Sequence, residues 1–303
     1  LYSAKKQGKA RMETFDLSMH EEAKQRLRLE MDLRHALEAN ALELYFQPIL
    51  NMRTGRIESC EALLRWRHEE LGPISPSEFI PIAEEVGLVI PIGEWVLRKA
   101  CSQMAAWRND GLLPDKFLLS VNLSGRQLTQ AHLEERILGI LEETGLPSTL
   151  LQIELTESAV MLAPDHANAL FAELRRRGIT VAIDDFGTGY SSLSYLQTMP
   201  FQTVKLDRSF VSAMVNPESR EIVRHIVALV HSIGMTIVAE GVEDEQQRDT
   251  LLELGCDHGQ GFLFARPLPP GQFITMLEAQ EGPRSLLRLF EKANCETALP
   301  TPR

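Results

Sequence analysis

Acidic and amide side chains end several apolar, β-rich runs of this sequence. In the first four such runs these residues are Glu61, Asn122, Glu154 and the adjacent pair Asp184–Asp185. Carboxylate and amide oxygens are the ligands that hard divalent cations such as Mg²⁺ and Mn²⁺ prefer. Carboxylates gathered at one place would repel each other strongly unless cations lay among them. The pattern therefore predicts a metal centre, with the adjacent aspartates able to serve two ions.

Three later runs carry further polar residues of the same kind. Lys205 lies in TVKLD, Glu240 ends TIVAE and Gln260 lies in DHGQG. A lone acid at a strand end is more often a helix cap or a solvated loop residue, but capping does not explain seven such runs. Two ions about 3.5–4 Å apart are the usual device for phosphoryl hydrolysis, because they lower the pKa of a bridging water. Lys205 would orient that water or offset charge on a phosphate.

The elements that must position these residues alternate between β-rich and helical runs. We predict strands at 42–46, 57–64, 117–123, 150–155, 179–184, 202–207, 235–240 and 257–263. We predict helices at 76–86, 91–109, 126–144, 165–177, 217–233 and 244–254. Continuous apolar runs suit parallel strands that are covered on both faces, whereas the short link NMRTGR makes the first pair antiparallel.

This alternation predicts an α/β fold, a (β/α)8 TIM-like barrel with an antiparallel first strand. A doubly wound open sheet is the alternative. In such a barrel the active site lies at the carboxyl ends of the strands, which is where the polar residues fall. The following segment, Asp184 to Ser192, reads DDFGTGYSS. It is not a kinase loop, because the sequence has neither a His-Arg-Asp loop nor a glycine-rich phosphate loop upstream. Glu157 either accepts hydrogen bonds from this segment or serves a helix N-terminus.

Composition limits the possible partners. The 303 residues carry a net charge of −11, so a basic surface for DNA or RNA polymers is not expected. The sequence has no apolar run of the roughly 20 residues that a membrane span needs, and we expect no membrane contact by this fragment. The four cysteines form no Cys-x-x-Cys pair and are expected to be reduced thiols in the cytoplasm. The chain starts at Leu1 without Met, so we expect it to be part of a longer protein. Any membrane anchor of that protein would lie outside this chain.

Several short motifs occur together in one order along residues 40–275. They are Phe46-Gln47-Pro48-Ile49, Glu61-Ala62-Leu63-Leu64-Arg65-Trp66, Val121-Asn122-Leu123-Ser124, Glu154-Leu155-Thr156-Glu157, the Asp184–Ser192 segment, Lys205-Leu206-Asp207-Arg208-Ser209-Phe210, Ala239-Glu240-Gly241-Val242-Glu243 and Gly259-Gln260-Gly261. This set resembles the EAL-domain cyclic di-GMP phosphodiesterases. The tripeptide Glu61-Ala62-Leu63 alone would carry little weight, and the accompanying motifs make the resemblance specific.

The resemblance implies metal-dependent hydrolysis of cyclic di-GMP to linear 5'-pGpG, with two divalent ions, Mg²⁺ or Mn²⁺, and a homodimer. It implies roles for individual residues as well. The metal ligands would be Glu61, Asn122, Glu154, Asp184 and Asp185; the residues that handle the water would be Lys205 and Glu240; the substrate-binding residues would be Gln47, Arg65 and Gln260; and Glu157 would steady the loop after the fifth strand. No metal or water-handling position departs from the family pattern.

Two other hypotheses remain open at this point. A cyclic di-GMP receptor with little turnover would keep the ligand site, although the intact Lys205 and Glu240 argue against it. A different barrel metalloenzyme, such as a sugar-phosphate lyase, would need a glycine-rich phosphate loop after the late strands, and none is evident.

The ends of the chain suggest a wider context. Residues 1–17 begin LYSAKKQGKARMETF and resemble the carboxyl end of a GGDEF domain, which implies a tandem GGDEF–EAL parent. We expect 18–40 to be a helix, either connecting the two domains or packed on one of them. We expect the phosphodiesterase barrel at 41–280, and a helix followed by a loose tail at 281–303.

Overall fold

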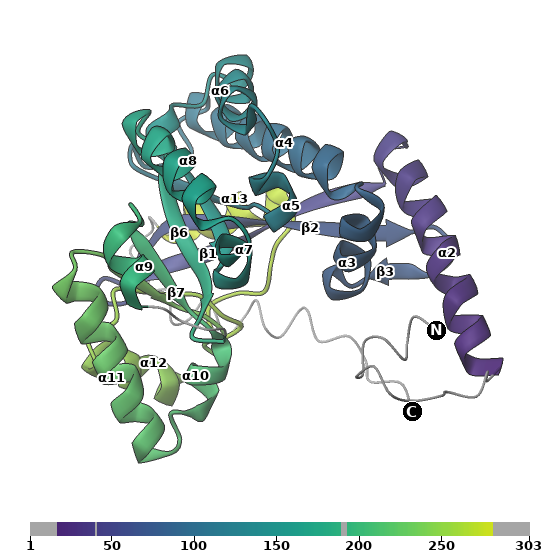
Figure 1. The fold of residues 1–303 in the computed structure, drawn as a ribbon. Helices are drawn as coiled ribbons and strands as arrows, with labels where there is room; N and C mark the ends of the chain where they lie inside the picture. The colour runs from purple at the N-terminus through teal and green to yellow at the C-terminus, as the bar shows by residue number, and fades with distance from the viewer. Residues whose placement is uncertain (1–16, 40, 189–192, 281–303) are drawn as a thin grey trace. The chain divides into compact units, whose positions relative to one another are not determined.

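The computed structural model describes residues 17–39, 41–188 and 193–280 (Figure 1). Contacts divide the chain into two compact units. The smaller unit comprises Leu1–Glu43 and Arg65–Val89, and the larger one comprises Leu44–Leu64 and Ile90–Arg303. The predicted GGDEF remnant, apart from its last residue, and the predicted C-terminal helix and tail lie outside the described residues and stay predictions.

Among the described residues, eight strands close into a barrel. They are β1 (Leu42–Asn51), β2 (Ile57–His68), β4 (Leu118–Asn122), β5 (Leu151–Thr156), β6 (Thr180–Phe186), β7 (Thr203–Leu206), β8 (Thr236–Ala239) and β9 (His258–Gly259). The order is β1-β9-β8-β7-β6-β5-β4-β2, and a β1–β2 pairing closes the ring. The pairs β2–β4, β4–β5, β5–β6, β6–β7, β7–β8 and β8–β9 are parallel, whereas β1 is antiparallel to β9. The predicted TIM-like barrel with an antiparallel first strand is confirmed, and the open sheet is wrong.

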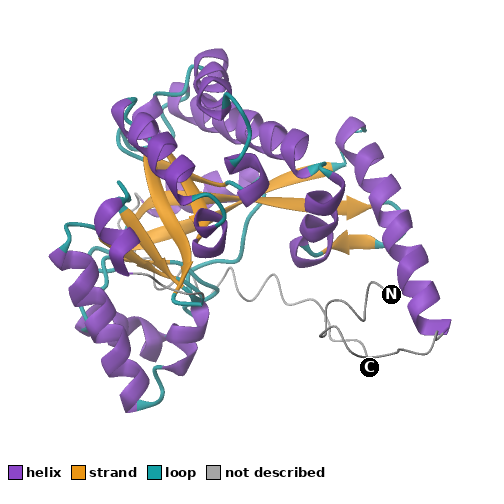
Figure 2. Ribbon diagram, viewed as in Figure 1, coloured by secondary structure: helices purple, strands orange, loops and turns teal. Residues whose placement is uncertain are grey.

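Helices flank these strands in the larger unit (Figure 2). They are α4 (Val89–Asn109), α5 (Gly125–Leu128), α6 (Leu133–Thr144), α7 (Glu157–Met161), α8 (Pro164–Arg176), α9 (Leu193–Thr198), α10 (Arg208–Ala213), α11 (Pro217–Ser232), α12 (Glu245–Glu253) and α13 (Pro270–Gln280), with a 3-10 turn at Ser148–Leu150. Helix α11 is typical, because Val223, Val227 and Val230 recur at helical spacing and are buried. Its N-terminus is capped by the Asn216 side chain, which accepts from the Glu218 amide.

The prediction of one helix over 126–144 is wrong. Ser124 forms a capping box with Gln127 that starts α5. The chain then turns, and His132 adopts a left-handed backbone with φ of 60° before α6 begins. The short helices α7, α9 and α10, the longer α13 and the strand β3 were also missing from the prediction, while the last barrel strand, expected at 257–263, has only two residues.

The polar and apolar residues of β5 alternate between the two faces of the barrel wall. Leu151, Ile153 and Leu155 are at most 1% exposed and lie on the face toward the helices. Gln152 and Glu154 therefore point into the barrel, because successive side chains of a strand lie on opposite faces. Gln152 and Glu154 are buried as well. Both faces of β5 are therefore buried, although only the face toward the helices is apolar.

The smaller unit contains α2 (Leu17–Glu38), the outer end of β2, β3 (Gly72–Ile74) and α3 (Pro76–Val86). Helix α2 matches the helix predicted at 18–40, whose connecting role stays a prediction. Leu29 and Leu33 of α2 are buried, and its Asp32 lies 2.9 Å from His68 Nε2. Strand β3 pairs antiparallel with the end of β2.

Two further predictions concern sulfur and membranes. Cys60, Cys101 and Cys256 are buried free thiols, and burial raises the pKa of each. Cys295 lies outside the described residues. In the described part of the chain, we find no helix with the length and apolar character that crossing a membrane requires.

Candidate active site

Lys205 lies at the centre of the carboxyl-terminal end of the barrel. Its ammonium forms four ion pairs, with Glu154 Oε2 at 2.6 Å, Glu240 Oε1 at 2.8 Å, Glu61 Oε2 at 3.2 Å and Asp184 Oδ1 at 3.3 Å. The Lys205 side chain is 1% exposed. Desolvation alone would lower the pKa of Lys205, but the surrounding carboxylates raise it well above its usual value. Lys205 is therefore a permanently charged counter-ion.

Glu61 of β2 is held by three donors. Asn122 Nδ2 donates to its Oε1 at 2.6 Å, while Gln260 Nε2 and Lys205 Nζ donate to its Oε2 at 2.8 and 3.2 Å. Desolvation alone would raise the pKa of Glu61, but Lys205 and the two amide donors together lower it. Glu61 is thus an ionised carboxylate of fixed orientation. It also brings Asn122 into the cluster from the end of β4.

Glu154 of β5 is the most deeply buried acid of the group, at 1% exposure. Its Oε2 accepts from Lys205, whereas its Oε1 has no hydrogen-bond partner among the described residues. Desolvation raises the pKa of Glu154 well above its usual value, and Lys205 offsets this only in part. A buried oxygen without a partner is costly, and a cation at this position would satisfy it.

Asp184, Asp185 and Glu240 each offer a carboxylate oxygen, and the three atoms lie within 4.8 Å of one another. Desolvation raises the pKa of Asp185, and the neighbouring Asp184 raises it further. Desolvation also raises the pKa of Glu240 to about 8, and Lys205 opposes this shift. The Glu240 carboxyl therefore keeps its proton into the neutral range unless a cation replaces it.

The backbone at Asp185 is strained. Its φ is 53°, in the left-handed region that non-glycine residues rarely adopt. Thr188 holds this conformation, since its amide and hydroxyl both donate to the Asp185 carbonyl, at 3.2 and 2.8 Å. Gly187 donates to Glu157 Oε2 at 3.4 Å, so the contact expected between Glu157 and this segment is present. Strain of this kind is frequent at functional sites. Residues 189–192 of the predicted motif lie outside the described residues.

Gln260 and Gln47 extend the site toward β1. Gln260 Nε2 donates to Gln47 Oε1 at 2.9 Å, and Gln47 Nε2 donates to the Ala265 carbonyl at 3.0 Å. Both glutamines are buried, and Gln260 Oε1 has no partner among the described residues. Arg65, the third predicted substrate-binding residue, belongs to the smaller unit, so its role stays a prediction.

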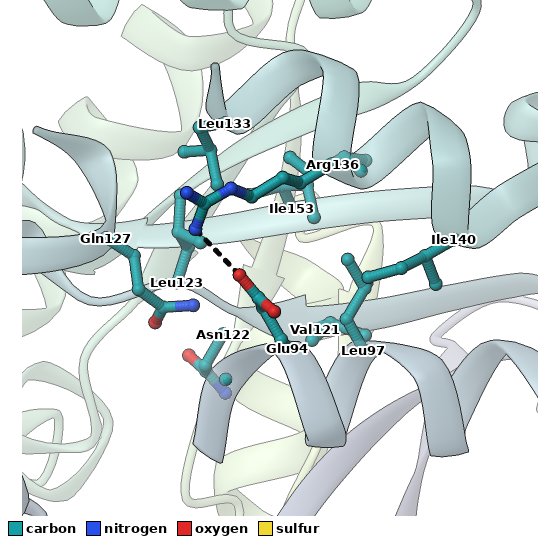
Figure 3. Close-up of a pocket in the computed structure, with 12 residues that line it drawn as sticks. Glu94, Leu97, Val121, Asn122, Leu123, Gln127, Leu133, Arg136, Ile140 and Ile153 are labelled. Carbon is teal, nitrogen blue, oxygen red and sulfur yellow. Dashed lines mark hydrogen bonds and ion pairs between the residues drawn. The ribbon is translucent and has the colours of Figure 1, made fainter. Parts of the chain in front are cut away.

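Two cavities of the larger unit are lined by none of the clustered carboxylates. One of about 20 Å³ lies beside α4 and α6, where Glu94 and Arg136 form an ion pair at 2.8 Å (Figure 3). This cavity has space for about one water molecule. Asn122 is the one residue of the cluster that lines it. The other, of about 790 Å³, is lined by Ile57 and Phe117, at the amino-terminal ends of β2 and β4. Neither cavity is therefore the place where the carboxylates converge.

The donor set fits hard divalent cations. It consists of oxygen atoms. Among the described residues, Lys205 is the only cation that forms ion pairs with the carboxylates of this set, and the buried Glu154 Oε1 has no hydrogen-bond partner. Mg²⁺ and Mn²⁺ favour such oxygen ligands, whereas softer metals favour sulfur and imidazole. The residues that would hold the ions are Glu61, Asn122, Glu154, Asp184 and Asp185, and Glu240 lies close to the last two.

The sequence of the chain matches the EAL domain family over residues 30–267. The chain belongs to the EAL domain family. The bifunctional diguanylate cyclase/cyclic di-GMP phosphodiesterase MucR of Pseudomonas aeruginosa is 41% identical over 276 residues, which are 91% of this chain and 40% of MucR. The cyclic di-GMP phosphodiesterase NbdA of the same organism is 38% identical over 280 residues, 92% of this chain and 36% of NbdA.

A solved structure of a similar EAL domain is that of the P. aeruginosa MucR phosphodiesterase in complex with cyclic di-GMP. It is 42% identical, has a TM-score of 0.78, and the alignment covers 81% of this chain and 99% of that one. This EAL domain chain spans well under half the length of MucR and NbdA. This chain is therefore similar to only one part of MucR and of NbdA.

The EAL barrel brings together most of the residues that the sequence singled out. Hydrogen bonds and ion pairs connect Glu61, Asn122, Glu154, Asp184, Lys205, Glu240, Gln260 and Gln47. Sequence reasoning missed the polar residues one layer deeper, of which Gln152 is the central one. The available signal was their position two residues before a site residue on the same strand.

Proposed function

We propose that this EAL domain hydrolyses cyclic di-GMP to linear 5'-pGpG with the help of two divalent ions, Mg²⁺ or Mn²⁺. The observation that carries the proposal is the cluster of carboxylates around Lys205 at the carboxyl end of the barrel. The named activities of MucR and NbdA, and the cyclic di-GMP bound to the MucR structure, support the choice of substrate.

The reaction consumes one water molecule. Its oxygen forms a bond to phosphorus, the bond from that phosphorus to a ribose 3' oxygen breaks, and the 3' oxygen takes up a proton. When bound, the two ions would supply Lewis acidity, which lowers the pKa of water and polarises the phosphate. The products are a 5'-phosphate and a free 3'-hydroxyl on one linear dinucleotide.

The residues of the chain would divide this work. Glu61, Asn122, Glu154, Asp184 and Asp185 would hold the ions. Lys205 would orient the water and offset charge on the phosphate, because its ammonium cannot readily lose a proton among four carboxylates. Glu240 would accept a hydrogen bond from the water.

Four further residues would act on the substrate or on the loop. Gln47, Gln260 and Arg65 would bind the substrate, Arg65 through the planar guanidinium that suits phosphate oxygens. Glu157 would hold the loop that carries Asp185, through its contact with Gly187.

The decisive experiment incubates this chain with cyclic di-GMP and Mg²⁺ or Mn²⁺, with an EDTA control, and separates the products by chromatography. We expect pGpG only when a divalent ion is present. Binding of cyclic di-GMP without product in either metal would contradict hydrolysis and would favour the receptor hypothesis. Product that persists in EDTA would contradict the role of the ions.

The context of the domain is also part of the proposal. The curated relatives are much longer than this chain, and MucR carries a diguanylate cyclase name, which supports a parent with a GGDEF domain before residue 18. We propose that the domain acts as a homodimer in the cytoplasm. Size-exclusion chromatography with light scattering would measure the oligomeric state. A single monomeric species at all concentrations would contradict the homodimer.

A further inference from the structure

Inside the barrel, a chain of hydrogen bonds connects four polar side chains from four strands. Ser120 Oγ donates to Gln152 Oε1 at 3.0 Å, and Gln152 Nε2 donates to Thr203 Oγ1 at 3.0 Å. Thr203 Oγ1 lies 3.2 Å from Thr236 Oγ1. Ser120, Gln152 and Thr203 are at most 7% exposed, so this buried polar layer crosses from β4 through β5 to β7. The exposed Thr236 of β8 lies at its end.

Each buried member of the polar layer lies directly beneath a residue of the candidate active site. Ser120 precedes Asn122 by two positions, Gln152 precedes Glu154 by two, and Thr203 precedes Lys205 by two. Residues two apart on a strand point to the same face. The register agrees for the first pair of strands, where Ser120 lies opposite Gln152 and Asn122 lies opposite Glu154.

The link from Gln152 to Thr203 spans the strand between them. Strand β6 separates β5 from β7, and its Ala182 pairs with Glu154 on one side and Thr203 on the other. Ala182 shares the inward face with Asp184, by the same alternation. Its single methyl leaves room for the Gln152 amide to reach across. The connection between β5 and β7 therefore depends on the long side chain of Gln152 and on the small side chain of Ala182 between them.

The charges above the polar layer make such a connection useful. Glu154 and Lys205 form the shortest of the four ion pairs, at 2.6 Å, and the remaining carboxylates repel each other. An apolar layer would support these residues by packing alone and would allow small slips along the strands. Hydrogen bonds are directional, and a fully connected buried network fixes one arrangement of the elements that carry it.

We propose that Gln152 is a positioning residue, which acts through Ser120 and Thr203 to set the relative heights of Asn122, Glu154 and Lys205. Its effect is on the affinity of the site for divalent ions and on the rate of the reaction, rather than on contact with substrate. The part of this proposal that concerns the reaction rate rests on the proposed function.

The test removes the hydrogen bonds while keeping the volumes. Gln152→Met and Thr203→Val are near-isosteric and break the link from β5 to β7. Thr203→Ser keeps the hydroxyl and loses only a methyl, so it serves as the conservative variant. The matched control is Ile153→Ala, since Ile153 lies between Gln152 and Glu154 but faces the helices. It lowers stability without touching the polar layer.

Three quantities are measured for each variant: the Kd for Mn²⁺ by titration calorimetry, the Tm without metal, and kcat and KM for cyclic di-GMP. We expect Q152M and T203V to weaken Mn²⁺ binding about tenfold, near the lower end of the effects seen when partners of metal ligands are removed. Their kcat should fall while KM changes little. T203S should bind Mn²⁺ within about twofold of the unsubstituted chain, and I153A should lower Tm but leave the Kd unchanged.

Two results would overturn the proposal: wild-type Mn²⁺ affinity in both Q152M and T203V, or a loss of affinity in I153A as large as theirs. The double variant Q152M/T203V adds a further check, because two residues that act through one link should have non-additive effects on the Kd. If the unsubstituted chain binds Mn²⁺ but makes no pGpG, the proposed function fails, while the Kd comparison still decides the role of the polar layer.

Discussion

Lys205 Nζ lies 2.6 Å from Glu154 Oε2, and both side chains are at most 1% exposed. Three more carboxylates lie within 3.3 Å of the same ammonium. The centre of the barrel therefore holds one positive charge among four acids. Without further cations this arrangement is poorly compensated, and the following predictions depend on that imbalance.

Lys205→Met removes the only cation that the described acids of this cluster contact. We expect the free energy of unfolding of the metal-free protein to fall by about 3 kcal/mol, because buried carboxylates lose their partner. Saturating Mn²⁺ should restore part of the loss, and activity should be absent. Denaturant titrations with and without Mn²⁺ measure this, with the exposed Lys116→Met as control. Equal stability of K205M and K116M would contradict the central role of Lys205.

Glu61→Ala and Asp184→Ala each remove a proposed metal ligand. We expect either change to lower the rate of pGpG formation by more than about 100-fold, since even partners of ligands account for 10- to 100-fold effects. The matched control is Glu58→Ala, an exposed acid of the same strand that contacts Asn51 and His258. Near-normal turnover in E61A or D184A would reject that residue as a ligand.

Binding of divalent ions should release protons below pH 8. In the metal-free site, burial raises the pKa of Glu240 to about 8, so the group is mostly protonated at pH 7. A bound cation favours the carboxylate, and the proton leaves. The apparent affinity for Mn²⁺ should therefore rise by up to about tenfold per pH unit from 6 to 8 and then level off.

Calorimetric titrations in buffers of different ionisation enthalpy count the released protons directly. Glu240→Gln cannot release this proton, so the count at pH 7 should be smaller in that variant. An affinity that is independent of pH in the unsubstituted chain would show that Glu240 is already ionised before the metal binds.

Ca²⁺ should bind to the site and support little hydrolysis. Its larger radius and looser coordination make it a weaker activator of water than Mg²⁺. We expect a pGpG rate below about a tenth of that with Mg²⁺, and competitive inhibition when Ca²⁺ is added to the Mg²⁺ reaction. Turnover in Ca²⁺ at the Mg²⁺ rate would argue against water activation by the ions.

Gly187→Ala should move the segment that carries Asp185. Gly187 has φ of 94°, and an added Cβ would lie 2.5 Å from the Phe210 ring. Gly111→Ala is the matched control, because Gly111 also has a positive φ, 72°, but has open space around it. Both variants should lose about 1 kcal/mol of stability from backbone strain. Only G187A should also lose Mn²⁺ affinity, and equal Kd values in the two variants would contradict the prediction.

Much of the site was predictable from the sequence, because the relevant patterns are local. The apolar runs and the polar residues that end them determine which side chains reach the carboxyl rim, once the runs are read as parallel strands. Glu61, Glu154 and Lys205 were found in this way. The helix 76–86 was predicted with correct limits, since Pro76 and Gly87 mark its ends.

Other features depended on contacts that are distant in the sequence. That Lys205 pairs with four acids, and that Asn122 donates to Glu61, follows from the closure of the barrel and the register between strands. The left-handed Asp185 depends on Thr188, within a segment whose glycine packs against Phe210. The break between α5 and α6 depends on the capping by Ser124 and Gln127.

The amino-acid sequence by itself determined the type of fold and the kinds of side chain at the rim, because strand alternation and helix periodicity are properties of neighbouring residues. Only the tertiary structure decided which oxygens lie together, which of them keep protons, and how Gln152 connects strands that are not adjacent. Those properties arise from distances and burial across the barrel, and both exist only after the ring of strands has closed.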